Sequence, residues 1–408
     1  LWDYGPYFTD KYKTPWGDAI NFDGPYSDEV RNFFVQNALS WVTDYHLDAL
    51  RIDAIHGIFD FSAKHVLREI GEAVHARAGE LGKHLFLIPE SDLNDVRAIN
   101  PVELGGHGLD AQWNDDFHHA LHTLLTGEQS GYYRDFGNIE HLEKAFREGF
   151  VYSGEYSAFR KRRHGSSSKD RPPRQFVVFS QNHDQVGNRM KGERLSSMVS
   201  FEQLKLAAGV VLLSPFIPLL FMGEEYGETA PFQYFVSHTD QALVEAIRKG
   251  RKAEFASFGW QGDVPDPGAE SVFLNSHVDL ELRHTGKHKG LLAYYAMLLN
   301  LRRSLSALSS LSKDDLDVTG YEQERALQVR RRHGGSDAII LYAFKDQPIA
   351  LTIMLPAGTW VRILDSSSPE WGGTGERAAA TIASHGEDIV LHLNPHSVVL
   401  YELSKKEQ

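Results

Sequence analysis

The sequence predicts an α/β fold built on a parallel sheet and followed by a small all-β domain. Five short apolar runs are each followed by a segment with helical periodicity, which is the pattern of repeated strand–helix units. From about residue 315 onward, apolar and polar residues alternate between Gly, Pro and Asp, as in strands with one buried face. The chain of 408 residues is long enough for a large and a small domain.

The expected elements follow one another in a regular order. Residues 1–26 alternate aromatic residues with Gly, Pro and Asp, which predicts ordered loops, and a helix capped by Ser27 should cover residues 27–46. Further helices are expected at 63–77, 117–125 and 201–213, and residues 160–174 should form a solvated loop. The expected strands lie in DALRIDAIH, HLFLIPESD, LDAQWND, QFVVFSQNHD and IPLLFMGEE.

In each of these units the polar residues come directly after the apolar run. Parallel strands joined by right-handed crossovers place such residues together at the carboxyl ends of the sheet, where α/β enzymes hold their active sites. A closed (β/α)8 barrel and an open doubly wound sheet both follow this rule. The pattern predicts the position of the chemistry and leaves the two architectures open.

Composition excludes several classes of function. A net charge of −13 gives no basic surface for nucleic acid, and no apolar run reaches the length of a membrane span. The absence of cysteine excludes disulfides and thiolate metal sites and is compatible with the cytoplasm, where we expect the protein to act. The opening LWDYGPYFTD has neither an initiator methionine nor a leader pattern, so we expect no signal peptide and interpret the chain as a fragment.

Asp53 is the first candidate for chemistry. It follows the apolar run that ends in Ile52, and Arg51 lies two residues before it on the same face of the expected strand. A neighbouring guanidinium favours the ionised carboxylate that a nucleophile requires. For an isolated Arg-x-Asp, a structural ion pair or a helix cap is the more common explanation.

Glu90 and Asp184 are the second and third candidates. Glu90 ends the apolar run LFLIP, where burial favours the protonated form needed by a general acid, although capping of the next turn is an alternative. Asp184 lies in SQNHDQVGN after another apolar run, beside His183, which is also compatible with a buried structural histidine. The order Asp, Glu, Asp at three strand ends favours a catalytic interpretation of the set.

Two carboxylates at one active site suit glycoside hydrolysis, in which one attacks the anomeric carbon and the other protonates the leaving oxygen. A metal centre is the rival use of such a cluster. No HExxH motif or close pair of histidines lies at these strand ends, and Arg51 beside Asp53 disfavours a cation. We therefore expect no metal and no cofactor.

The segments RIDAIH, IPESD and SQNHDQ resemble, in order and spacing, the second, third and fourth short motifs of the α-amylase family. The resemblance implies a (β/α)8 TIM barrel of which strands 4–8 are present, a C-terminal β-sandwich and retention of the α-configuration. The implied domains are a partial barrel over 1–314 and a sandwich over 315–408. The resemblance implies Asp53 as nucleophile, Glu90 as acid/base, Asp184 as transition-state stabiliser, and Arg51, His56 and His183 as sugar-binding residues.

A narrower resemblance runs through the segments between the motifs, such as GLDAQWNDDFHHALHTLLTGE and SPFIPLLFMGEEYGE, which are similar to the maltooligosyltrehalose trehalohydrolases. That group releases trehalose by cleaving the α-1,4 bond next to a terminal trehalose unit, so the implied partner is maltooligosyltrehalose or a related α-glucan. The further substrate contacts that this resemblance implies are Asp115, Asp116, Phe159, Arg160 and Glu225.

Three alternatives stay open at this point. A branching enzyme, a debranching enzyme or a trehalose synthase of the same family would share the three motifs. A glucan-binding relative without activity would usually lack one of the acids, and a purely structural domain would not need them. The family's first motif and three barrel strands would precede residue 1, so we expect the chain by itself to fold poorly or to be inactive.

Overall fold

The computed structural model of the chain describes residues 2–257 and 264–404. The chain divides into two compact units. Unit 1 comprises Leu1–Asp115 and Tyr152–Val177, and unit 2 comprises Asp116–Val151 and Val178–Gln408. Leu1 and residues 405–408, at the outer ends of the two predicted domains, lie outside the described residues.

Unit 1 opens with a β-hairpin, not with the loops that were predicted for residues 1–26. Strands β1 (Phe8–Thr14) and β2 (Gly17–Ile20) pair antiparallel. The prediction was wrong because FTDKYKT carries aromatic and β-branched residues that suit a strand, and the Gly and Pro lie mostly outside it. Gly17 closes the turn with a φ of 120°, and the Thr14 hydroxyl donates to its carbonyl oxygen over 3.0 Å.

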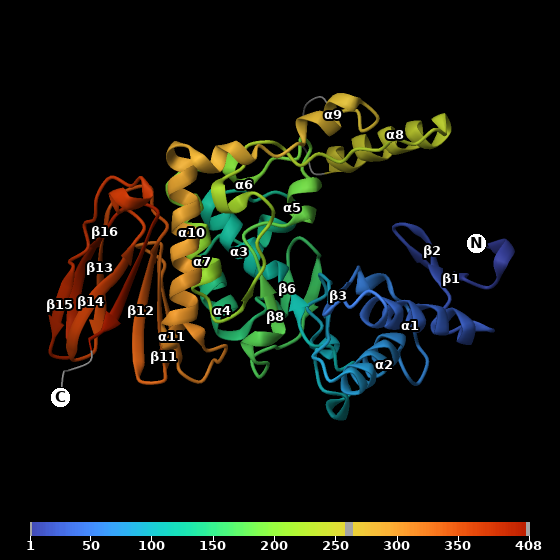
Figure 1. The fold of residues 1–408 in the computed structure, drawn as a ribbon, viewed down its shortest axis with the longest axis horizontal. Helices are drawn as coiled ribbons and strands as arrows, with labels where there is room; N and C mark the ends of the chain where they lie inside the picture. Colours follow the sequence, from blue (N-terminus) through green and yellow to red (C-terminus); the bar gives the residue numbers. More distant parts are fainter. Residues whose placement is uncertain (1, 258–263, 405–408) are drawn as a thin grey trace. The chain divides into compact units, whose positions relative to one another are not determined.

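Two helices and two parallel strands form the core of unit 1. Helices α1 (Ser27–Thr43) and α2 (Val66–Leu81) lie side by side, and strands β3 (Ala49–Ile52) and β4 (Phe86–Pro89) pair in parallel (Figure 1). Ser27 is the first helical residue of α1 and not its cap, because Tyr26 occupies the cap position. The buried core side chains include Val42, Val74 and Leu87.

The remaining elements of unit 1 are short. Strand β5 (Gln112–Trp113) pairs in parallel with β8 (Phe176–Val178). Strands β6 (Ser153–Ser157) and β7 (Arg162–Gly165) form an antiparallel hairpin, so part of the predicted loop at 160–174 is a strand. The 3₁₀ helices are Trp2–Tyr4, Ile55–Gly57, Val96–Ala98, Val102–Leu104 and Pro173–Gln175.

Unit 2 begins with helices and one short strand. The predicted helix at 201–213 is α7 (Phe201–Leu212), which Ser200 and Gln203 cap reciprocally. Strand β9 (Ile217–Pro218) continues the β5–β8 sheet, and Leu219 N donates to Val178 O over 2.9 Å. The other helices are α3 (Asp115–Thr126), α4 (Ile139–Glu148), α5 (His183–Gly187), α6 (Leu195–Met198), α8 (Gln241–Ser257), α9 (Glu270–Asn275), α10 (Gly286–Ser304) and α11 (Ser306–Ser309), with 3₁₀ helices at Gly131–Asp135, Glu224–Tyr226, Leu280–His284 and Pro369–Trp371.

The rest of unit 2 consists of antiparallel strands that lie beside α7 and α10 (Figure 1). One sheet has the order β10-β11-β12-β17-β14-β15, and β13 pairs with β16. Side chains from both sheets, among them Leu341, Leu351 and Trp360, form one buried core. The bounds are β10 (Leu316–Tyr321), β11 (Ala326–His333), β12 (Ser336–Ala343), β13 (Ile349–Leu355), β14 (Gly358–Asp365), β15 (Thr381–Ser384), β16 (Glu387–Leu393) and β17 (Ser397–Leu403).

Each of the five predicted strands of the α/β part is present, as β3, β4, β5, β8 and β9. The predicted domain boundary between residues 314 and 315 stays a prediction, since unit 2 extends across it. Among the described residues, no helix is both long and apolar enough to cross a membrane.

Two arginines, the buried Arg331 and the partly buried Arg302, hold the turn between α7 and β9. Arg302 Nη1 donates to the carbonyl oxygens of Leu212 and Ser214 over 2.9 and 2.7 Å. Arg331 Nη1 donates to those of Leu213 and Ser214 over 2.9 and 3.1 Å. Burial lowers the pKa of Arg302 to about 10 and that of Arg331 to about 9. At neutral pH both stay charged and neutralise the negative end of the helix dipole.

Candidate active site

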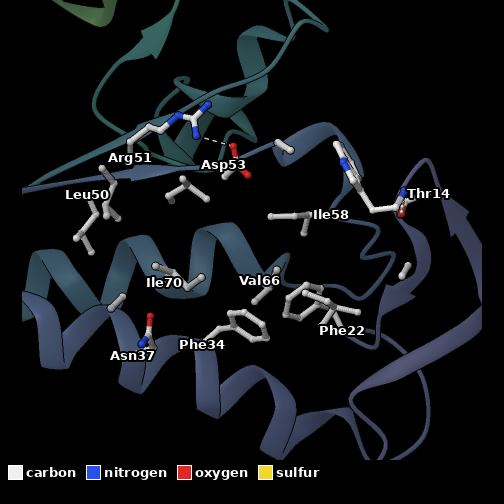
Figure 2. Close-up of a pocket in the computed structure, with 18 of the residues that line it drawn as sticks. Thr14, Phe22, Phe34, Asn37, Leu50, Arg51, Asp53, Ile58, Val66 and Ile70 are labelled. Carbon is white, nitrogen blue, oxygen red and sulfur yellow. Dashed lines mark hydrogen bonds and ion pairs between the residues drawn. The ribbon is translucent and has the colours of Figure 1, made fainter. Parts of the chain in front are cut away.

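Arg51, Asp53 and Glu90 come together at the carboxyl ends of β3 and β4 in unit 1. Arg51 Nη1 lies 2.5 Å from Asp53 Oδ1, and Arg51 Nη2 lies 3.4 Å from Glu90 Oε2 (Figure 2 shows the first contact). The guanidinium is also stacked on the indole of Trp113, 4.5 Å from the ring centre. The Asp53 side chain is 76% exposed and the Glu90 side chain only 14% exposed, so Asp53 is the more accessible carboxylate.

The turn after Asp53 is held in an unusual conformation by Glu90. Ala54 has a φ of 43° and a ψ of 48°, the left-handed region that residues with a Cβ rarely adopt. Its N–H donates to Glu90 Oε2 over 2.8 Å, and the next N–H, of Ile55, donates to Glu90 O over 3.0 Å. These bonds retain the strained turn and fix the Glu90 carboxyl group.

An apolar groove of about 600 Å³ lies beside Asp53. Figure 2 shows how its walls are built: Phe34 and Asn37 come from α1, Leu50 from β3 and Ile70 from α2. Within the described residues β3 pairs with β4 alone, and the groove lies next to that strand.

A second acid, Asp92, organises the polar residues that follow Glu90. Its Oδ2 accepts from Arg160 Nη1 over 2.9 Å, and its Oδ1 lies 4.0 Å from His56 Nδ1. Burial disfavours the charged form of Asp92, whereas the neighbouring Arg160 favours it. The net effect is that the pKa of Asp92 lies below its ordinary value. Arg160 also lies 5.9 Å from the ring centre of Phe159, which is 39% exposed. The structure thus brings together three predicted contacts, His56, Phe159 and Arg160, around an acid that the prediction missed.

Asp184 lies in the first turn of α5 in unit 2. The buried Asn182 caps this helix: its Oδ1 accepts from Asp184 N over 2.8 Å and from Gln185 N over 3.3 Å. His183 Nε2 lies 3.4 Å from Asp184 Oδ1. Both side chains are about half exposed, and the cap fixes the backbone that carries them.

Two buried contacts hold the segments on either side of this helix. His118 Nδ1 donates to Ser180 O over 2.8 Å, and its Nε2 accepts from the Tyr133 hydroxyl over 2.9 Å, so His118 is a neutral imidazole. Burial places the pKa of His118 well below its ordinary value. After the helix, Arg189 Nη1 lies 2.9 Å from Glu128 Oε2. Sequence reasoning did not find these residues, because their partners are far apart in the chain.

Two adjacent glutamates follow β9. Glu225, a predicted substrate contact, is partly exposed in the 3₁₀ helix Glu224–Tyr226. Glu224 is buried and accepts from Ser180 Oγ, Gln181 Nε2 and Tyr295 Oη over 3.3, 3.4 and 3.5 Å. Burial raises the pKa of Glu224 to about 8, so most of the population is protonated at neutral pH.

Asp115 and Asp116 begin α3. Asp116 is 4% exposed, and its Oδ2 accepts from Val151 N over 2.7 Å. This position is typical of a structural carboxylate, and the contact of Asp116 with substrate stays a prediction. Asp115 is partly exposed. Within the described ranges, no group of three or more His, Asp or Glu side chains has the arrangement of a metal site.

The chain is similar in sequence to several known proteins. No family model matches the chain. The maltooligosyltrehalose trehalohydrolase of Arthrobacter ramosus is 44% identical over 358 residues, which cover 87% of this chain and 59% of the relative. That of Saccharolobus solfataricus is 46% identical over 299 residues, which cover 73% of this chain and 50% of the relative. Over most of its own length, the chain is therefore similar to the maltooligosyltrehalose trehalohydrolases.

A solved structure supports the fold. A Salmonella typhimurium protein assigned as an α-amylase superposes with a TM-score of 0.81 at 34% identity, covering 98% of this chain and 64% of that one. The chain therefore has the α/β fold of a protein assigned to the α-amylases. The chain spans between half and three fifths of the length of the two curated relatives.

Proposed function

We propose that the protein to which this chain belongs is a glycoside hydrolase that cleaves the α-1,4 bond next to the terminal trehalose of maltooligosyltrehalose and releases trehalose. The observation that carries the proposal is the constellation of Arg51, Asp53 and Glu90 at the carboxyl ends of two adjacent parallel strands. Two curated relatives that are 44% and 46% identical to this chain are named maltooligosyltrehalose trehalohydrolases. Their names support maltooligosyltrehalose as the substrate.

The reaction we propose is a double displacement with retention of configuration. Asp53 attacks the anomeric carbon and forms a covalent glycosyl ester, while Glu90 gives its proton to the departing trehalose oxygen. The ionised Glu90 then takes a proton from water, whose oxygen attacks the same carbon and releases Asp53. Asp184 stabilises the oxocarbenium-like transition state in this scheme.

The remaining predicted residues take binding roles in the proposal. Arg51 orients Asp53, and His56 and His183 bind hydroxyl groups of the sugar. Phe159 and Arg160 shape the trehalose side of the site, supported by the Arg160–Asp92 pair in unit 1. Asp115, Asp116 and Glu225 complete the set of proposed substrate contacts.

We further propose that β3, β4, β5, β8 and β9 are strands 4–8 of a (β/α)8 barrel, within a catalytic domain at 1–314 that precedes a β-sandwich at 315–408. The parallel β3–β4 and β5–β8 pairs support this. In such a barrel the apolar groove beside β3 would receive the preceding strand. The absence of cysteine supports action in the cytoplasm.

The competing assignment is another enzyme of the α-amylase family, such as a branching enzyme, a debranching enzyme or a trehalose synthase. These enzymes would use the same three acids with different acceptors. A protein retaining only glucan binding is a second alternative. The chain is 44% identical to a trehalohydrolase over 87% of its length. The proposed activity explains this identity more directly than either alternative does.

Incubation of the full-length protein with maltooligosyltrehalose, followed by chromatography of the products, tests the substrate assignment. We expect trehalose and a shortened maltooligosaccharide, and no trehalose from a Glu90→Gln variant, which cannot supply the proton. Release of maltose or of branched glucan without trehalose would show that the assignment is wrong, and a protein without any activity would leave only glucan binding.

A further inference from the structure

Unit 1 contains a second cavity, of about 310 Å³, which is separate from the groove beside β3. Residues that follow the two candidate catalytic acids in the chain, His56 and Ser91, form part of its wall, but neither Asp53 nor Glu90 lines it. The polar and aromatic groups that give the cavity its chemical character are Phe59, Phe61, His65, Asp95, His107 and Gln112.

Gln112 lines this cavity and carries a buried hydrogen-bond acceptor without a partner in the described residues. Its side chain is fully buried on β5, and its Nε2 donates to Ser91 O over 3.3 Å, which fixes the orientation of the amide. Among residues 2–257 and 264–404, no group donates to Gln112 Oε1. Buried amide oxygens normally accept a hydrogen bond, so this atom is suited to a donor inside the cavity.

His65 lines the same cavity. Its Nδ1 accepts from Leu67 N over 3.2 Å as the cap of α2, which leaves the proton of the neutral ring on Nε2. Burial lowers the pKa of His65, and burial together with His65 lowers that of His107 to about 4. The two neutral rings stack with their centres 4.4 Å apart.

The charged residues of the cavity wall are paired with each other or with the protein. Arg97 Nη2 lies 2.6 Å from Asp95 Oδ2. Asp60 Oδ2 accepts from Arg31 Nη1 and from Val66 N, each over 2.6 Å. No charge of the wall therefore requires a counter-ion, which disfavours a phosphate or an ammonium ligand.

We propose that this cavity binds a neutral, hydroxylated six-membered ring, that is, a single pyranose monosaccharide. One hydroxyl donates to Gln112 Oε1, and another accepts from His65 Nε2–H. The apolar face of the ring packs against the aromatic side chains of the wall. The volume lies near the lower end of the range for ligand pockets, which suits one sugar ring and not a glucan chain. Apart from His56, no proposed catalytic residue or substrate contact lines the cavity, and binding there does not depend on catalytic activity.

Isothermal titration of the full-length protein with D-glucose, in the presence of saturating maltotetraose, tests the proposal. Maltotetraose occupies glucan-binding subsites but is too long for the cavity, so glucose binding that persists belongs to the cavity. We expect binding in the millimolar range, and at least tenfold weaker binding of glucose 6-phosphate.

Two variants locate the binding. Gln112→Met removes the acceptor but keeps a side chain of similar length, and it should weaken glucose binding at least tenfold. His107→Phe keeps the stacked ring but removes its polar nitrogens, and it should have an effect of the same size. Gln36→Met, on the exposed face of α1, is the matched control and should bind as the wild type does. Loss of glucose binding on addition of maltotetraose, or wild-type affinity in folded Gln112→Met or His107→Phe, would overturn the proposal.

Discussion

Glu224 shows how burial alone can set a charge state beside the candidate site. It adjoins Glu225 in the sequence, yet its side chain is buried among Ser180, Gln181 and Tyr295. The raised pKa of about 8 means that the folded protein retains a proton that the unfolded chain releases near pH 4.5. The stability of the protein must therefore depend on pH through this residue.

We expect stability to fall as the pH rises from about 4.5 to about 8, by at most about 1.4 kcal/mol per pH unit, and to level off above that range. Glu224→Gln cannot ionise, so the difference in free energy of unfolding between this variant and the wild type should grow across the same window. Urea unfolding at a series of pH values measures the difference. A difference that is independent of pH would refute the assigned protonation state.

At the residue scale, sequence reasoning could find the acids that end apolar strands but not their partners. Asp53 and Glu90 follow apolar runs directly, so their position at the end of the sheet is encoded locally. The pairing of Arg160 with Asp92 joins residues 68 positions apart and depends on tertiary structure. Asp92 did carry a signal, since it follows Glu90 by two residues and shares its face of the chain.

At the scale of elements, the five-residue helix α5 fixes the backbone of Asp184. A helix this short has little intrinsic stability, so its cap matters more than it would in a long helix. Asn182 provides that cap through a single oxygen that accepts from two N–H groups. The position of Asp184 therefore depends on one side chain that does not itself belong to the proposed acid set.

We expect Asn182→Ala to lower the free energy of unfolding by about 1 kcal/mol, because the helix loses its cap. The same variant should lower kcat on the order of 10- to 100-fold with little change in KM, because Asp184 is less well positioned. Asn182→Ser retains an accepting oxygen at the cap and should recover most of both losses. Steady-state kinetics and urea unfolding of the two variants measure these effects. A rise in KM with unchanged kcat would contradict a positioning role for the cap.

Elements with strong local signals were predicted correctly, and elements defined by pairing were not. The helix expected at 201–213 is α7, because its apolar residues and its Ser200 cap are local features. The β1–β2 hairpin was missed because Gly and Pro dominated the interpretation of residues 1–26, although the strand residues lie between them. Strands β5 and β9 were predicted from the runs that contain them, but their length of two residues each could not be predicted, because it depends on pairing.

At the scale of the whole molecule, the two units differ in how their strands are supported. Strand β12 lies between β11 and β17, and residues 338–343 within it are fully buried. Strand β3 pairs with β4 alone within the described residues, and the apolar groove lies beside it. Local opening should therefore require less free energy at β3 than at β12.

We expect the amides of β3, at Ala49–Ile52, to exchange with solvent deuterium well before those of β12 at Ser336–Ala343 when the 408-residue chain is studied alone. Exchange followed by mass spectrometry of peptides measures the order. Protection of β3 should rise in the full-length protein if a further strand pairs with it there. Equal protection of both strands in the isolated chain would contradict this account of its stability.

The proposed chemistry depends most directly on Asp53 as the nucleophile. The test is to treat the full-length Glu90→Gln variant with α-maltosyl fluoride, whose leaving group needs no protonation, and to digest the quenched protein for mass spectrometry. Without the base that activates water, the covalent intermediate should accumulate as a maltosyl ester on Asp53. A maltosyl ester on another residue, or turnover of the fluoride with inversion of configuration, would contradict the proposed mechanism.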